Sequence, residues 1–179
     1  VTGTPGDYTV TVKTAPRYVN ENCTACGECG NVCETEIAND FNFGMNRRKA
    51  AYLPHNMAFP MRYVMDAAMS TDDRDKVKEA CKYDAVDFDM SEKTIDLKVG
   101  AVVWNTGWVP YDATKIDNLG FGRHQNIVTN MMLERLASKN GPTEGKILRP
   151  SDDKEPATIA FAQCAGSRDE NHLSYCSYI

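Results

Sequence analysis

The chain has 179 residues, of which 42% are hydrophobic and 25% charged, and its formal net charge is −5. This length predicts one medium domain or two small ones with a hydrophobic core, and the negative charge argues against nucleic-acid binding. No apolar run approaches the roughly 18 residues of a membrane-spanning helix, and the polar N-terminus does not resemble a signal peptide. We therefore expect a cytoplasmic protein without direct membrane insertion. Because the chain begins with Val1 rather than Met, we expect it to be part of something longer.

Hydrophobic patterns in the first half of the chain predict one strand and two helices. Alternating apolar and polar residues indicate a strand over residues 8–13. A helix is expected from Pro60 to about Met69. A second helix is expected to begin after the capping residue Ser70, with carboxylates in its first turn, and to end at about Cys81.

Further along the chain, alternation predicts a hairpin formed by residues 86–90 and 95–99. The continuous apolar runs 101–104 and 158–163 indicate fully buried strands, and a short helix is expected over 130–139. The cysteine-rich first part and this second part, which looks like a fragment of an α/β domain, together indicate an α+β chain.

Seven cysteines are the strongest signal in the sequence, and four of them lie between Cys23 and Cys33. Their spacing, C-x2-C-x2-C-x3-C, is that of bacterial ferredoxins, in which the fourth cysteine of the run ligates a second cluster. No second run of this kind is present, and Cys81 stands where the remote fourth ligand of the first cluster would fall. We therefore predict one 4Fe–4S cluster, with Cys33 left over and the ligands Cys23, Cys26, Cys29 and Cys81.

Two other kinds of site compete with this prediction. A structural zinc site also uses four cysteines, but zinc sites usually present two separated C-x2-C pairs. The overlapping spacings here, with Gly27 and Gly30 permitting close backbone approach, favour a cluster. Thiol–disulfide exchange at Cys164 and Cys176 is disfavoured because no C-x-x-C pair lies near them. Taken alone, each of these two cysteines is expected to be a buried structural thiol.

A weaker pattern concerns flavin. The apolar run before Thr106 and Gly107 is followed by Pro110. In flavoproteins with two dinucleotide-binding domains, a strand ending in Thr-Gly-x-x-Pro passes beside FAD, whereas the alternative is a plain strand-to-loop turn. The glycine-rich phosphate-binding fingerprint is absent, so we expect FAD in the complete protein and no tight FAD binding by this chain alone.

Several segments together resemble the A-subunit family of heterodisulfide reductases. They are the cysteine run, Glu79-Ala80-Cys81, residues 99–108, residues 141–152 and residues 163–170. The resemblance implies a ferredoxin-like 4Fe–4S domain at 16–92, inserted in part of a thioredoxin-reductase-like FAD domain formed by 1–15 and 93–179. It also implies that Cys164 and Cys176 contribute ligands to a second, unusual cluster.

Residues 34–39, 51–60 and 171–173 look closest to the A-subunit of the quinone-interacting membrane-bound oxidoreductase of sulfate reducers. This implies an electron-transfer protein that relays electrons between a quinone-linked membrane partner and cytoplasmic adenylylsulfate reductase, and is held at the inner membrane by partner subunits. The alternatives are a zinc-binding interaction module and heterodisulfide-reductase-type thiol–disulfide electron transfer. The scattered histidines form no catalytic constellation, so we predict no complete catalytic site in this chain.

Overall fold

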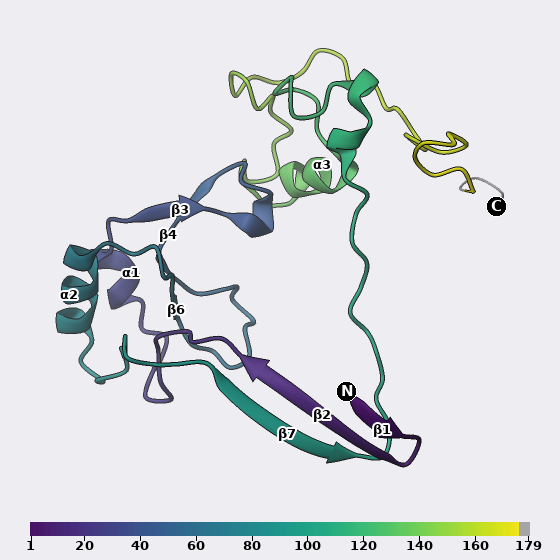
Figure 1. Ribbon diagram of the computed structural model, residues 1–179. Helices are drawn as coiled ribbons and strands as arrows, with labels where there is room; N and C mark the ends of the chain where they lie inside the picture. Colours follow the sequence, from purple (N-terminus) through teal and green to yellow (C-terminus); the bar gives the residue numbers. More distant parts are fainter. Residues whose placement is uncertain (176–179) are drawn as a thin grey trace. The chain divides into compact units, whose positions relative to one another are not determined.

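Short helices and small antiparallel sheets make up the protein, an α+β arrangement, in a computed structural model that describes residues 1–175 (Figure 1). The chain divides into two units. The first unit comprises Val1–Ala38 and Arg47–Thr106, and the second comprises Asn39–Asn46 and Gly107–Ile179.

A three-stranded antiparallel sheet lies at one end of the first unit, in the order β1 (Thr2–Thr4), β2 (Asp7–Thr14) and β7 (Lys93–Val99). β2 confirms the strand predicted from alternation. Its pairing with β7 places Thr14 opposite Lys93, so the segment 15–92 leaves and rejoins the sheet at adjacent positions.

The predicted hairpin is half right. Residues 95–99 lie in β7, but they pair with β2 and not with residues 86–90. The latter segment is bonded instead to residues 18–20, because Asp87 donates its N–H to the Tyr18 carbonyl and Val86 bridges Val19. A period-2 pattern shows that a strand is compatible with the sequence, but the partner is chosen by long-range contacts.

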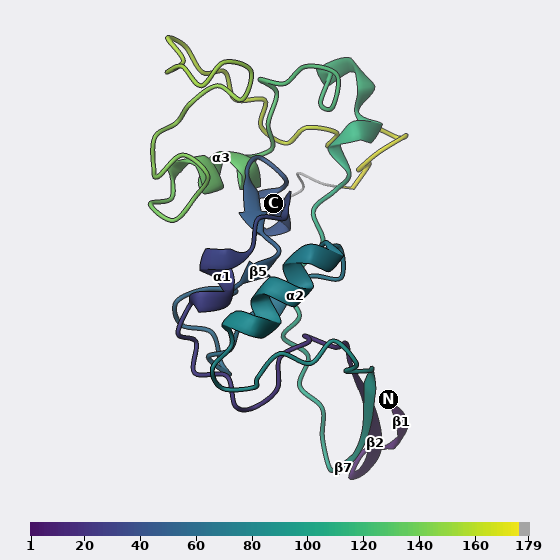
Figure 2. The same cartoon turned by 90° about the vertical axis from the view of Figure 1, so that its left-hand side faces the viewer.

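Two helices and two small sheets form the rest of the first unit. The helices are α1 (Glu28–Val32) and α2 (Thr71–Ala80), and they lie side by side (Figure 2). The sheets pair β3 (Glu36–Ala38) with β4 (Arg47–Lys49) and β5 (Ala51–Tyr52) with β6 (Val64–Met65). Between them lies the hydrophobic core, formed by Val19, Cys33, Ala50, Ala51, Met65, Met69, Val77, Ala85 and Val86.

The helix predicted after Ser70 is confirmed: the Ser70 hydroxyl accepts a hydrogen bond from the Asp73 N–H and caps α2. The helix predicted over 60–69 is wrong. Met65 donates its N–H to the Arg17 carbonyl and Asp66 donates to the Ala50 carbonyl. These inter-segment bonds use the groups that a helix would need internally, so sheet pairing replaces the helix.

The second unit contains α3 (Asn130–Ala137), which confirms the helix predicted over 130–139, and the short 3-10 helices η2 (Ala113–Lys115) and η3 (Asp117–Leu119). A further 3-10 turn, η1 (Asp40–Asn42), joins this unit from the β3–β4 connection. There the Arg135 guanidinium donates to the Asn42 side chain over 2.8 Å and stacks on Phe41. No helix within residues 1–175 is long and apolar enough to cross a membrane.

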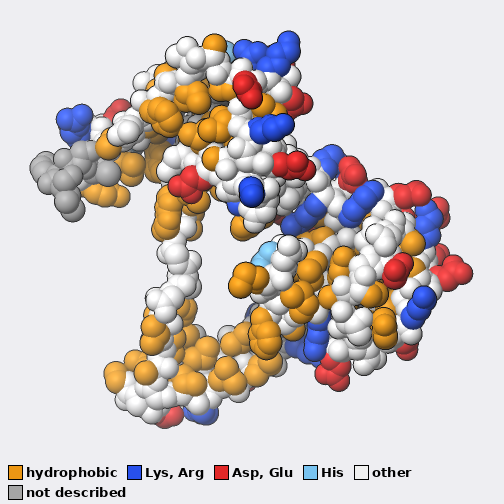
Figure 3. All heavy atoms as spheres, turned by 180° about the vertical axis from the view of Figure 1, so that it is seen from behind, with side chains coloured by type: hydrophobic (Ala, Val, Ile, Leu, Met, Phe, Trp, Pro, Cys, Tyr) orange, Lys and Arg blue, Asp and Glu red, His pale blue; other side chains and the backbone are white. Residues whose placement is uncertain are grey.

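The buried strands predicted at 101–104 and 158–163 are wrong. Neither run is a strand, and most of both are exposed, with Trp104 at 69% and Phe161 at 66% exposure. Among the described residues, no strand pairs with either run. Val12, Ile95 and Leu97 of the sheet are exposed as well, and hydrophobic side chains gather on the surface over the sheet (Figure 3).

The core residue Val77 supplies a test of this packing. Because it is fully buried, Val77→Ala should leave a cavity and lower the free energy of unfolding by about 2 kcal/mol in denaturant titrations. Val103 is 80% exposed, and Val103→Ala is the matched control, with an expected change below about 0.5 kcal/mol. Equal effects of the two substitutions would contradict the proposed core.

Candidate metal centre

Four cysteines from two distant parts of the sequence line one pocket of the first unit. Its space free of protein atoms, part of it open to solvent, is about 340 Å³. The cysteines are Cys23, Cys26, Cys29 and Cys81, the four that the spacing predicts as cluster ligands. Cys33 does not line this pocket, and the remaining walls are mostly apolar or aromatic side chains, among them Val19, Tyr63, Met65, Tyr83 and Val86.

The loop that carries the first three cysteines has an unusual backbone. Ala25 has a φ of 56°, which is rare for a residue with a side chain, and Gly27 has a φ of 92° just before α1. In this conformation the Ala25 N–H points at the Cys23 sulfur, at 3.4 Å. Such N–H groups stabilise a thiolate, so the loop is built to hold negative sulfur.

The fourth cysteine reaches the pocket from the C-terminus of α2, where Cys81 caps the helix. The Ala85 N–H points at the Cys81 sulfur, also at 3.4 Å, and repeats the arrangement at Cys23. Asn20 joins this segment to the ligand loop, because its side chain donates to the Asp84 carbonyl and its carbonyl accepts from the Cys23 N–H. The two segments that carry the pocket cysteines are thus hydrogen-bonded to each other.

The thiols of this pocket could ionise together only if a positive charge lay close to them. Burial, together with the neighbouring Cys23 and Cys26, raises the pKa of Cys29 to about 12. Several thiolates would therefore repel one another here unless a cationic centre compensated them. Among the described residues, no group of three or more His, Cys, Asp or Glu side chains stands in metal-binding geometry. Four thiols that line one pocket are a donor set that either zinc or an iron–sulfur cluster can use.

Tyr63 is a wall of this pocket that the sequence analysis missed. A Cβ atom on Gly30 would lie 3.3 Å from the Tyr63 ring, and one on Gly27 would lie 3.5 Å from the Tyr63 hydroxyl. The phenol therefore lies directly against the glycines of the ligand loop. Burial, and after it the charges of Cys29, Cys26 and Cys23, raise the pKa of Tyr63.

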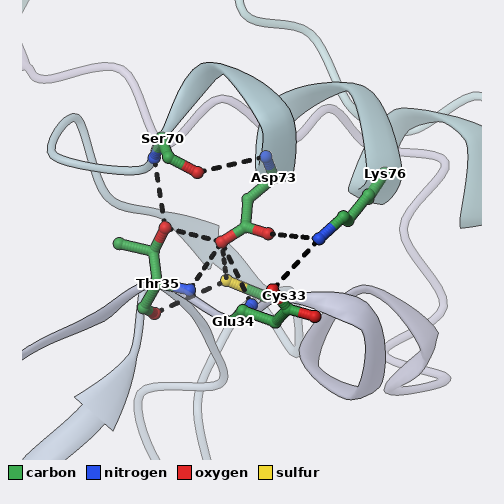
Figure 4. A network of polar contacts seen from close by, with 6 residues as sticks. All are labelled: Cys33, Glu34, Thr35, Ser70, Asp73 and Lys76. Atoms are coloured by element: carbon green, nitrogen blue, oxygen red, sulfur yellow. Dashed lines mark hydrogen bonds and ion pairs between the residues drawn. The ribbon is translucent and has the colours of Figure 1, made fainter.

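Cys33 belongs to a separate polar network centred on the buried carboxylate of Asp73 (Figure 4). One Asp73 oxygen accepts from the Glu34 N–H at 3.0 Å and from both the N–H and the hydroxyl of Thr35 at 2.5 Å. The Cys33 thiol is 3.8 Å from the same oxygen, and Lys76 pairs with the other. Burial and the Asp73 charge raise the pKa of Cys33, so this cysteine stays a protonated core residue.

One face of α2 links this network to the pocket. Asp73, Val77 and Cys81 follow one another at intervals of four residues, so they lie on the same side of the helix. Asp73 holds the segment after Cys33, Val77 is fully buried beside α1, and Cys81 enters the pocket. The carboxylate at one end of the stripe therefore helps to fix the thiol at the other.

The remaining residues singled out from the sequence are not brought together. Thr106 and Gly107 are exposed, and Gly107 has the positive φ of 70° that suits a turn. Cys164 is exposed on a turn, which contradicts the buried position expected for it; the run before it has no covering layer among the described residues. Cys176 lies outside the described residues.

A pocket of four cysteines in a small α+β unit is typical of proteins that hold an inorganic centre through thiolates. No protein-family profile matches the sequence. The whole chain is 42% identical to the iron–sulfur A-subunit of a CoB–CoM heterodisulfide reductase of Methanopyrus kandleri and 41% identical to that of Methanocaldococcus jannaschii. It is 35% identical, over 99% of its length, to the A-subunit of a ferredoxin:CoB–CoM heterodisulfide reductase of Methanosarcina acetivorans.

The chain therefore belongs to the A-subunit family of heterodisulfide reductases. It spans only 28%, 27% and 26% of the length of these three relatives. The family resemblance inferred from the sequence is thus confirmed.

The Asp73 network predicts a specific pH behaviour. Hydrogen bonds from Thr35 and Glu34 lower the pKa of Asp73 from 3.8 to about 2, against the effect of burial. Because the folded pKa is the lower one, this stabilisation is complete above about pH 4 and is lost as the pH falls toward 2. Asp73→Asn should therefore cost about 2 kcal/mol of unfolding free energy, with the same cost from pH 5 to pH 8.

The exposed neighbour Asp72 provides the matched control, since it lies in the same helical turn. Asp72→Asn should change the unfolding free energy by less than a quarter of the Asp73 effect in the same titrations. A cost at Asp73 that disappears above pH 5, or an equal cost at both positions, would show that the network does not contribute in this way.

Proposed function

We propose that this chain is the part of an electron-transfer subunit that holds one 4Fe–4S cluster through Cys23, Cys26, Cys29 and Cys81. The observation that carries the proposal is that these four thiols line the same pocket although Cys81 is far from the others in the sequence. The names of the relatives, which are iron–sulfur subunits of oxidoreductases, support the same function.

The arrangement of the thiols favours a cluster over zinc. A single Zn²⁺ needs its four sulfurs about 2.3 Å from one point. Zinc sites usually present two separated C-x2-C pairs, whereas Cys23, Cys26 and Cys29 have overlapping x2 spacings. A cubane takes one cysteine at each of four iron corners, and this run can supply three of them from one loop, with Cys81 as the fourth.

In this proposal the cluster, when bound, supplies reversible one-electron transfer. The protein's own residues determine how readily it does so. The N–H groups of Ala25 and Ala85 point at ligand sulfurs and stabilise their negative charge. Val19, Met65 and Val86 keep water from the inner wall, while the exposed Cys26 marks the side open to solvent. Electrons would pass on that side, where the centre lies nearest to the surface.

The domain arrangement follows as part of the proposal: a ferredoxin-like insert at 16–92 within a thioredoxin-reductase-like FAD domain. The pairing of Thr14 with Lys93 supports it, because an insert must begin and end at neighbouring points of its host. For FAD, the supporting observations are the Thr-Gly-x-x-Pro pattern that begins at Thr106 and the positive φ of Gly107. The exposed apolar sides of residues 101–104 and 158–163 are also what an incomplete host domain would present.

The physiological setting is a finer proposal. The segments at 34–39, 51–60 and 171–173 support a component of the quinone-interacting membrane-bound oxidoreductase, exchanging electrons with adenylylsulfate reductase in the cytoplasm. The relatives from methanogens carry names that include hydrogen, formate or ferredoxin and the CoB–CoM heterodisulfide. Reduction of such a disulfide in a complex with other subunits is the competing assignment for the whole protein.

Elemental analysis tests the proposal directly. Anaerobically purified protein should be brown and contain about four irons and four acid-labile sulfides per chain. Zinc should be far below one per chain. Stoichiometric zinc without iron or sulfide would overturn the proposed cluster in favour of a zinc-binding module.

The ligand set predicts opposite outcomes for two cysteine variants. Cys81→Ala removes a pocket thiol and should give either no cluster or a three-iron form, seen by iron analysis and electron paramagnetic resonance. Cys33→Ala removes a core thiol outside the pocket and should keep about four irons, with only a modest loss of stability. A cluster that survives in Cys81→Ala and disappears in Cys33→Ala would invalidate the ligand assignment.

A further inference from the structure

The Tyr63 hydroxyl has no hydrogen-bond partner among the described residues, although it lies against the ligand loop and lines the pocket. The hydroxyl is not among the buried polar atoms without a partner, so it keeps some contact with solvent and is free to donate to a group in the pocket. The pocket presents mostly apolar side chains and the sulfurs of its four cysteines, and its other polar side chains, Thr24 and Glu28, belong to exposed residues. This places an unused donor beside the proposed cluster.

The position of the ring is fixed by its neighbours. Tyr63 immediately precedes β6, whose Met65 is buried and donates its N–H to the Arg17 carbonyl. On the other side, the ring edge lies 3.3 Å from the Cβ position of Gly30, and any larger residue there would displace it. The phenol is therefore held against the loop and does not move freely in solvent.

We propose that Tyr63 is a positioning residue that donates its hydroxyl hydrogen bond to a sulfur at the three-cysteine side of the centre and thereby raises its reduction potential. The inference rests on the proposed cluster. Reduction adds negative charge to the centre, so a donor directed at sulfur stabilises the reduced form more than the oxidised form.

The matched pair of variants is Tyr63→Phe and Tyr83→Phe. Both residues line the pocket, but Tyr83 is 48% exposed and does not contact the loop glycines. The net contribution of one hydrogen bond changes an equilibrium constant about two- to twelvefold, so Tyr63→Phe should lower the equilibrium constant for one-electron reduction by about that factor. Tenfold corresponds to about 59 mV in an anaerobic redox titration followed by absorbance and paramagnetic resonance. Tyr83→Phe should change it less than twofold.

Iron and sulfide are measured first in each protein. A wild-type protein without them would refute the proposed function, whereas intact clusters with equal potentials in wild type and Tyr63→Phe would refute only the role of Tyr63. Equal shifts in both variants would also refute it, since the effect would then reflect general pocket polarity. Should Tyr63→Phe fail to hold a cluster, 3-fluorotyrosine at position 63 replaces it. This stronger donor should raise the potential, and an unchanged or lower value would refute the role.

Discussion

The site depends on one buried carboxylate. Asp73 accepts three hydrogen bonds from Glu34 and Thr35, and so binds the segment after the cysteine run to the first turn of α2. Two turns later the same helix ends at Cys81. Without this attachment, the helix could slide or rotate relative to the loop, and the fourth thiol would no longer face the other three. Hydrogen bonds to the buried carboxylate are directional, so they fix the orientation of α2 relative to the loop. Apolar packing at Val77 alone would not fix that orientation.

The Asp73 network also explains why Cys33 lies outside the pocket that the other three cysteines of the run line. In the two-cluster pattern the last cysteine of the run turns toward a second cluster. In this chain Cys33 turns toward Asp73, at 3.8 Å, and is enclosed with Val77 and Met69. The negative charge of this carboxylate disfavours ionisation of the Cys33 thiol, and the thiolate is the form that binds metal. The run therefore has the spacing of the two-cluster pattern, but its last member, Cys33, is part of the protein core.

The gathering of Cys23, Cys26, Cys29 and Cys81 in one pocket was predictable, because metal–thiolate chemistry restricts the spacing of such cysteines and the spacing can be read directly from the sequence. The helix after Ser70 was predictable for a similar reason, since its cap is local. Tyr63 reaches the site only through contacts between distant segments, and the same holds for the bond from the Asn20 side chain to the Asp84 carbonyl, so the neighbouring sequence marks neither role. The wrong predictions at 60–69, 101–104 and 158–163 have the same origin. An apolar pattern shows which secondary structures are compatible with a segment, whereas contacts with distant segments determine which structure it adopts.

The register of β2 with β7 has a consequence for how such a protein arises. Thr14 and Lys93 are paired at the end of the antiparallel ladder formed by β2 and β7. A short turn between these two residues would join the strands directly. Everything from residue 15 to residue 92 is an excursion from that ladder. A gene could gain or lose the excursion with little disturbance to the strands, because the ends already meet. Because the segment begins and ends at neighbouring points of one strand pair, it can be replaced by another segment while β2 and β7 keep their register.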